Sequence, residues 1–270
     1  MDPSSFFPVL SGMLGGAASA GVFKGPIQTV EDWWFINFGH TTNEKAEMLR
    51  AKQEASIEAY KTSILEEVAK INPTNLKEPE LKILGPALEA SKYYIEEEEL
   101  REMFAKLISS SMDKSNESIT HASYVEIIKQ LSPLDAENLK CLYSNKGEDV
   151  ICTLTIDYST GGYATKFRNL YIGNPNIQDQ SLIGPSLDNL QRLGLIEITT
   201  QEHKTNSNLY SPFENTPEYK SVEEEITHQN SGLEVLQNVE KTLPKFSGPV
   251  LEKGIIRLNL YGSNFCATCL

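Results

Sequence analysis

Residues 95–113, IEEEELREMFAKLISSSMD, carry the most regular pattern in the chain. Their large apolar side chains recur at positions i, i+3, i+4, i+7 and i+8, which form a single stripe on a helix: Leu100, Met103, Phe104, Leu107 and Ile108. The run of glutamates at 96–99 falls where the dipole of such a helix favours negative charge. The stretch therefore predicts a helix that buries one face, and its charged residues suit a scaffold better than a reactive site.

Further helices are predicted on both sides of this stretch. Residues 43–71 carry apolar side chains near helical spacing, and the two prolines of 72–79 break the pattern before another helical zone begins at Leu81. After it, 121–131 (HASYVEIIKQL) reads as a short helix. Ser132 then has the position of an N-cap for the helix that follows. We predict a helical domain over residues 43–131.

The pattern changes after residue 148. Strands are expected at 151–156, 195–199 and 255–260, a helix at 184–194 that ends at a C′ glycine, and a short final helix at 261–270. The polar residues 200–249 show only one weak helical segment, at 231–243. Helix, strand, helix, strand, long connection and strand is the order of a winged helix with an enlarged wing.

The predicted fold is therefore mainly α with a small α+β part. An N-terminal helical region is followed by a winged-helix-like C-terminal domain over 132–270, which carries a long polar insertion at about 200–249. Residues 1–42 form a Gly/Ala-rich apolar arm. Within this arm the uncharged residues 3–23 are long enough to span a bilayer, but they contain two prolines and four glycines and lack the cationic start of a signal peptide. A partly buried flexible arm is favoured, and a membrane-associating segment is the alternative.

The charge of the chain argues against nucleic acid as a partner. The net charge is −13, and an acidic surface repels the phosphates whose neutralisation supplies most nucleic-acid affinity. The predicted helix 184–194 offers only Arg192 as a cation, opposed by Asp188, which makes a poor reader of a DNA groove. Four cysteines do not make a disulfide framework, and they fit a reducing cytoplasm.

The sequence contains no recognisable catalytic constellation. Phosphate-binding glycine loops, the GxSxG elbow and the HExxH zinc motif are all missing from it, and its histidines lie far apart. His121 stands at a predicted helix start, where a structural hydrogen bond is the expected role. Cys266 and Cys269 form a CxxC that would need further ligands to bind a metal, so buried core cysteines are favoured over a metal or redox site. No cofactor is predicted, and a non-enzymatic protein is favoured.

Four segments resemble the abortive infection alpha (Abi-alpha) family, which occurs in bacteria and their mobile elements and is associated with defence against bacteriophage. They are LKILGPALEASKYYIEEEELREMFAKLISSSMD (81–113), HASYVEIIKQLSPLDAENLKCL (121–142), SLDNLQRLGLIEI (186–198) and LYGSNFCATCL (260–270). The resemblance implies protection of a bacterial population by halting growth or killing the infected cell. It implies no catalytic residue.

The favoured hypothesis is a cytoplasmic defence protein that acts through a protein partner or through self-association. Arg101, Phe104 and His121 are its candidate structural or interaction residues, and Arg101 leads because a guanidinium beside a buried stripe can lock a neighbouring segment. The first alternative is a membrane-acting effector that uses residues 3–23 on activation. The second is a DNA-binding regulator that uses the winged-helix-like domain.

Overall fold

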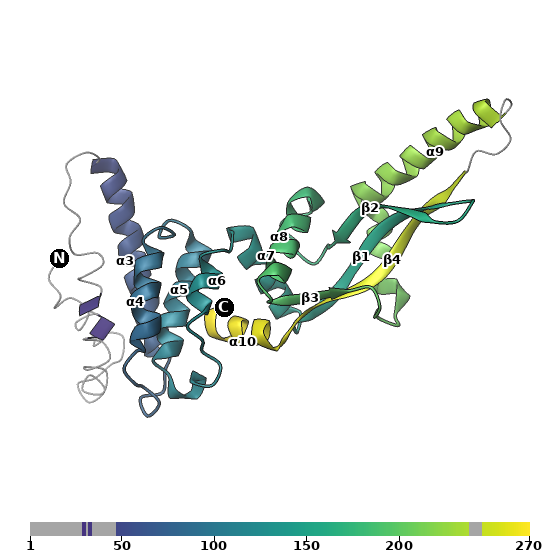
Figure 1. Ribbon diagram of the computed structural model, residues 1–270. Helices are drawn as coiled ribbons and strands as arrows, with labels where there is room; N and C mark the ends of the chain where they lie inside the picture. The colour runs from purple at the N-terminus through teal and green to yellow at the C-terminus, as the bar shows by residue number, and fades with distance from the viewer. Residues whose placement is uncertain (1–28, 31, 34–46, 238–244) are drawn as a thin grey trace. The chain divides into compact units, whose positions relative to one another are not determined.

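Helices form the first half of the described chain, and a four-stranded antiparallel sheet organises the second half (Figure 1). The structure, a computed structural model, describes residues 29–30, 32–33, 47–237 and 245–270. The chain divides into two compact units, one of residues 1–136 with 264–270 and the other of residues 137–263. We call them the helical unit and the sheet unit.

The helical unit is built around the stretch quoted first, which forms helix α5 and packs against α3, α4 and α6. The apolar stripe that the sequence predicts in α5 is confirmed, because each of its five side chains is at most 1% exposed. Three other helices surround α5, and one short 3₁₀ turn follows it. The bounds of these elements are α3 Glu47–Ala69, α4 Leu81–Ser91, α5 Glu98–Ser111, η2 Lys114–Asn116 and α6 Tyr124–Ile128.

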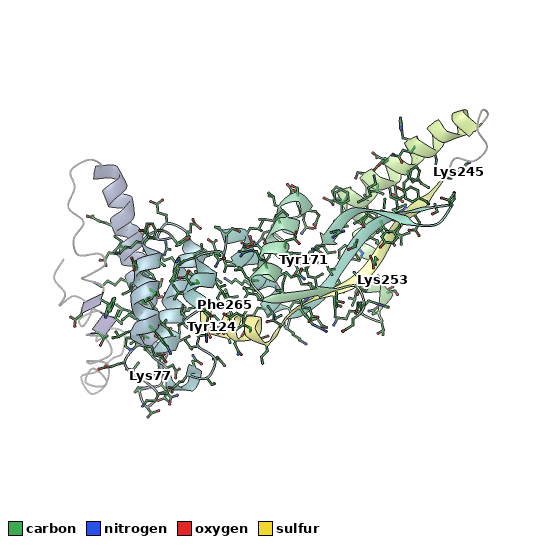
Figure 2. The ribbon with its side chains drawn as sticks, viewed as in Figure 1. Lys77, Tyr124, Tyr171, Lys245, Lys253 and Phe265 are labelled. Carbon is green, nitrogen blue, oxygen red and sulfur yellow. The ribbon has the colours of Figure 1, made fainter. Side chains whose placement is uncertain are left out.

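The last turn of helix α10 (Leu260–Cys269) packs within the helical unit. Its backbone carbonyls are satisfied by side chains of α5: Ser110 Oγ donates to the Thr268 carbonyl at 3.0 Å, and Lys106 Nζ donates to the Leu270 carbonyl. Phe265 stands edge-on to Tyr124, with ring centroids 5.2 Å apart (Figure 2). Carbonyls at a helix end have no partner inside the helix, so these side chains supply what the helix lacks.

The sheet unit contains four strands in the order β2-β1-β4-β3, all antiparallel. Helix α7 precedes β1, α8 precedes β3, and two 3₁₀ turns and α9 lie between β3 and β4. The bounds are α7 Pro133–Ser144, β1 Glu148–Tyr158, β2 Tyr163–Leu170, α8 Gln180–Arg192, β3 Ile196–Thr199, η3 Ser207–Leu209, η4 Ser211–Asn215, α9 Pro217–Gln237 and β4 Phe246–Leu258.

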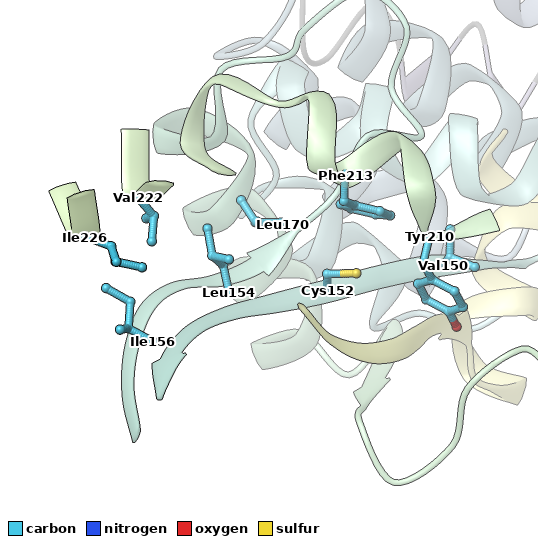
Figure 3. Close-up of a cluster of buried hydrophobic side chains, with 9 residues drawn as sticks. All are labelled: Val150, Cys152, Leu154, Ile156, Leu170, Tyr210, Phe213, Val222 and Ile226. Carbon is cyan, nitrogen blue, oxygen red and sulfur yellow. The ribbon is translucent and has the colours of Figure 1, made fainter. Parts of the chain in front are cut away.

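One face of the sheet is buried under α9 and the 3₁₀ turns (Figure 3). Alternate residues of β1 point into this cluster, as expected when successive side chains of a strand face opposite ways. Its buried members are Val150, Cys152, Leu154, Ile156, Leu170, Tyr210, Phe213, Val222 and Ile226. The cluster anchors the first half of α9 on the sheet.

Capping explains where two of the helices begin and end. At α7, Ser132 Oγ accepts from the Asp135 N–H at 3.1 Å and Asp135 Oδ2 accepts from the Ser132 N–H at 2.7 Å, a reciprocal capping box that confirms Ser132 as the N-cap. At α8, Gly194 has a φ of 72°, which confirms the predicted C′ glycine. The predicted start of α8 was wrong. The helix begins at Gln180 because Asp179 Oδ1 accepts from the Ser181 N–H at 2.9 Å, which leaves Pro185 inside it.

Other sequence-based expectations are corrected by the structure, are not tested by it, or lie outside the described residues. Strand β2 was not predicted, and β4 begins at Phe246, well before the predicted 255. The supposedly unpatterned insertion 200–249 contains α9, although the predicted helix 231–243 runs beyond the described residues after 237. The mixture of helices with a small sheet is confirmed, whereas the winged helix and the domain limits 43–131 and 132–270 stay predictions. The predicted arm, 1–42, lies almost wholly outside the described residues.

Candidate binding groove

A polar groove of about 460 Å³ lies in the sheet unit. Every strand and helix α8 contribute to its lining, and Thr153 of β1 places it on the sheet face opposite the α9 cluster. The side chains that matter most for its chemistry are Thr153, Thr165, Arg168, Asp188, Gln191 and Glu252. We call this feature the sheet groove.

A β-bulge in β2 shapes the sheet groove. Cys152 pairs with Leu170 and Leu154 pairs with Phe167, so three steps along β2 match only two along β1. Within the bulge, Asn169 has a φ of 55°, a left-handed conformation that asparagine tolerates better than most residues. Bulges re-aim neighbouring side chains and are common beside functional sites. Here Arg168, the residue before Asn169, lines the sheet groove.

The bulge is tied to helix α8 by a side-chain hydrogen bond. Asn169 Nδ2 donates to Asp188 Oδ1 at 3.0 Å. The bond joins the edge strand of the sheet to the helix on the other side of the sheet groove, and it uses one oxygen of a lining carboxylate. Asn169, the residue that follows Arg168, therefore fixes the part of β2 that carries Arg168 against helix α8.

The charged side chains in the lining are one guanidinium and two carboxylates. Arg168 and Glu252 form no ion pair or side-chain hydrogen bond within the described part of the chain, and both side chains are exposed. Lys166, two residues before Arg168, is different, because its Nζ pairs with Glu225 of α9 at 2.5 Å. Of these two cations of β2, one is committed to the fold and the other is available to a ligand.

The lining offers groups for hydrogen bonding and for recognition of charge. Threonine hydroxyls and the amide of Gln191 can donate and accept hydrogen bonds, and a guanidinium recognises planar oxyanions. Among the described residues that line it, none is a histidine, cysteine or serine. The arrangement suits recognition of a polar partner.

A second polar pocket, of about 310 Å³, lies in the helical unit between α3, α5 and α10. Its two lysines are already engaged: Lys70 pairs with Glu67 at 2.7 Å, and Lys106 bonds to the Leu270 carbonyl. Side chains with intramolecular partners offer less to a ligand. This pocket is therefore a weaker candidate than the sheet groove.

The candidate residues in α5 lie within the packing of the helical unit. Arg101 Nη1 donates to the Ile95 carbonyl at 3.0 Å, which ties the segment before α5 to the helix. Phe104 is fully buried, with its ring 6.1 Å from that of Tyr94. Neither residue lines the sheet groove, and their roles in interaction stay predictions.

His121 lies at the start of α6. Its Nδ1 accepts from the Ser123 N–H at 3.1 Å and lies 2.6 Å from Ser123 Oγ. The donor is Ser123, the residue just before α6, so the imidazole orders the chain where it enters the helix. This placement fits the structural hydrogen bond that the sequence predicts.

The cysteines of the CxxC motif are both fully buried. Burial raises the pKa of the Cys266 thiol to about 12 and raises the pKa of the Cys269 thiol well above its ordinary value, so both stay protonated at neutral pH. In the part of the chain that the structure describes, no three histidine, cysteine, aspartate or glutamate side chains lie close enough to hold a metal ion. Both thiols of the motif lie in the core of the helical unit.

Sequence reasoning missed the sheet groove because it missed β2. The usable signal was Gly161-Gly162 between ICTLTIDY and YATKFRNL, since a glycine pair between two strand-like runs indicates a hairpin. Both glycines have positive φ, of 91° and 87°, as such a turn requires. Nothing local in the sequence links Arg168 with Glu252, because only the strand order brings them to one face.

The fold and the sheet groove define a mixed helix-and-sheet protein with a candidate binding site. The abortive infection alpha family matches residues 52–269, which is most of the chain, and the protein belongs to this family. The comparisons with curated proteins and with solved structures give no match. The resemblance drawn from the sequence is thus confirmed at the level of the family.

The structure bears only in part on the membrane hypothesis. Among the described helices, none combines the length and the apolar character needed to cross a bilayer. Residues 3–23, on which the hypothesis depends, lie outside the described residues.

Proposed function

We propose that this protein takes part in abortive-infection defence against bacteriophage by binding a protein partner at the sheet groove, without a catalytic step of its own. Membership of the abortive infection alpha family supports the role in defence. The chemistry of the sheet groove supports binding, because its lining offers hydrogen-bonding groups and an arginine that has no ion pair among the described residues. The proposal places the protein in the cytoplasm, where its free cysteines would stay reduced.

One observation carries this proposal: Arg168 is displayed on the sheet groove by a bulge and has no ion pair within the described part of the chain. A purely structural arginine would be expected to hold a neighbour, as Arg257 holds Glu197 and Glu202 at 3.0 and 2.9 Å. Arginine is also among the residues that most often dominate protein–protein binding energy.

The second alternative, a DNA-binding regulator, receives less support from helix α8. In a winged-helix-like arrangement α8 would read DNA, but its Asp188 and Gln191 line the sheet groove. Its one arginine, Arg192, donates to Asn189 Oδ1 of the same helix at 2.7 Å. We therefore propose that the winged-helix-like sheet unit serves protein recognition. Salt-dependent binding of DNA by the purified protein would reverse this preference.

The proposal is tested by Arg168→Ala in a phage-challenge assay. The variant is expected to lose protection and also to lose the partner that wild-type protein captures from infected cells. Arg192→Ala is the matched control, since it removes an exposed arginine of the same unit whose guanidinium already has an intramolecular partner. Full protection by Arg168→Ala would reject the sheet groove as the working surface.

A further inference from the structure

The charges of the sheet groove lie in a row across the strands. Thr153 of β1 pairs with Glu252 of β4, and on its other side it faces the bulge of β2 that carries Arg168. Neighbouring strands are about 4.8 Å apart, so Arg168 and Glu252 start from backbones separated by roughly 9.6 Å. A cation and an anion thus stand on either side of a threonine, and neither has a side-chain partner within the described part of the chain.

The net negative charge of the lining side chains limits the kind of ligand that the sheet groove can bind. Asp188 joins Glu252 as a second carboxylate, so the lining carries more negative than positive charge. A phosphate group on Arg168 would lie beside these carboxylates, and like charges at close range are costly. A partner that brings a carboxylate to Arg168 and a cation to Glu252 gives each of these two side chains an ion pair. A net charge of −13 further favours an approaching segment that carries a cation.

The polar groups between the charges suit a peptide. The hydroxyls of Thr153 and Thr165 and the amide of Gln191 can each donate and accept, as backbone amides do. Tyr163, which also lines the sheet groove, is 68% exposed, so the site opens to solvent rather than enclosing a small molecule. In an extended segment, residues i and i+2 face the same way about 6.8 Å apart, a span that long charged side chains extend to about 10 Å.

We infer that the occupant of the sheet groove is an extended segment of a partner protein that carries one acidic and one basic side chain two residues apart. Its carboxylate pairs with Arg168, and its cation pairs with Glu252. The inference rests on the proposed function and specifies the kind of partner that the same surface takes.

Binding of the full chain to capped pentapeptides of three charge compositions tests the inference. In each peptide the first, third and fifth residues are threonine. The second and fourth residues are one glutamate and one lysine, in either order, in the mixed peptide. They are both lysine in the lysine peptide and both glutamate in the glutamate peptide. Affinities are measured by NMR titration. The mixed peptide is expected to bind about fivefold more tightly than either like-charged peptide, the size of one exposed ion pair.

Two variants sharpen the test by removing one charge at a time. Arg168→Gln is expected to erase the preference for the mixed peptide over the lysine peptide, and Glu252→Gln the preference over the glutamate peptide. Arg192→Gln should leave the ranking unchanged. Either charge variant is sufficient if the other fails to fold, which thermal unfolding would reveal.

Equal affinity for the three peptides, or an unchanged ranking in both charge variants, overturns the inference. That failure is distinct from failure of the proposed function. If Arg168→Ala abolishes phage protection while the peptides bind alike, the sheet groove works but its ligand class is wrong. If Arg168→Ala protects fully, the proposed function itself falls.

Discussion

Helix α5 and strand β2 differ most in how regular their sequence patterns are and in how far their side chains are buried. In α5 the sequence pattern is regular, and the apolar side chains that make it so are buried in the helical unit. In β2 the pattern is weak, half of the strand is polar, and two irregularities interrupt its pairing with β1. Yet β2 presents an arginine with no ion pair among the described residues, whereas the arginine of α5 holds a backbone carbonyl. The contrast teaches that regular patterning marks scaffold and that the side chains available to a partner lie where the pattern breaks.

The largest expected effect tests the scaffold side of this contrast. Phe104→Ala removes a fully buried ring from α5 and should lower the free energy of unfolding by about 3–5 kcal/mol. Tyr163→Ala, on β2, should cost less than about 0.5 kcal/mol because the ring is mainly exposed. Urea unfolding followed by circular dichroism measures both. Similar losses for the two variants would break the comparison.

The next effect concerns the bulge. Asn169→Ala places an alanine in the left-handed region and removes the bond to Asp188, so we expect a loss of about 2 kcal/mol in stability. Asn169→Gly loses the same bond but not the backbone conformation, and it should be less damaging. Thermal unfolding of the two variants separates the effect of the lost hydrogen bond from the effect of the left-handed backbone conformation. An Asn169→Gly variant less stable than Asn169→Ala would show that the bulge does not need its positive φ.

A smaller effect, per unit of pH, comes from the buried cysteines. The folded pKa of Cys266 is about 12, above the ordinary value of a thiol, so its contribution to stability is complete at neutral pH. It is lost as the pH rises from about 9 towards 12, because the unfolded chain ionises first, at up to about 1.4 kcal/mol per pH unit. Unfolding measured between pH 8 and 11 should show this decline, and Cys266→Ala should make it shallower. Equal slopes for the two proteins would contradict the assignment.

Arg168→Ala, like Tyr163→Ala, should change the free energy of unfolding by no more than about 0.5 kcal/mol, because the side chain is exposed and unpaired within the described part of the chain. The same substitution is the one expected to abolish protection. Thermal unfolding alongside the phage assay makes the contrast sharp. A large loss of stability would mean that Arg168 belongs to the scaffold after all.

Much of the framework was open to prediction from the sequence for a physical reason. The stripe of α5, the capping residues of α7 and the β-branched run of β1 each encode structure within a few residues, so local patterns identify them. Strand β2 and the first half of β4 are not encoded locally in this way, because they contain poor strand formers: Lys166, Asn169, Gly248 and Pro249. Pairing with β1 holds these two segments in the sheet.

The sheet groove was beyond sequence reasoning because its residues come together only through long-range pairing. Arg168, Asp188 and Glu252 share one surface through the strand order β2-β1-β4-β3 and the packing of α8. None of the three belongs to a motif. The candidates chosen from the sequence came from the well-patterned region instead: Phe104 is buried in its core, Arg101 bonds the Ile95 carbonyl, and His121 is an exposed residue before α6.

The hydrogen bonds from α5 to the end of α10 also determine the order in which the two units can fold during synthesis. The Ser110 hydroxyl and its acceptor, the Thr268 carbonyl, are 158 residues apart, and the whole sheet unit is encoded between them. The ribosome must therefore synthesise the sheet unit before the last part of the helical unit is available. Until then Tyr124 lacks its contact with Phe265, and the core of the helical unit is incomplete. Conversely, after a protease cut within the sheet unit, residues 264–270 would be held in the helical unit only by noncovalent contacts, among them the hydrogen bond from Ser110 and the packing of Phe265 on Tyr124.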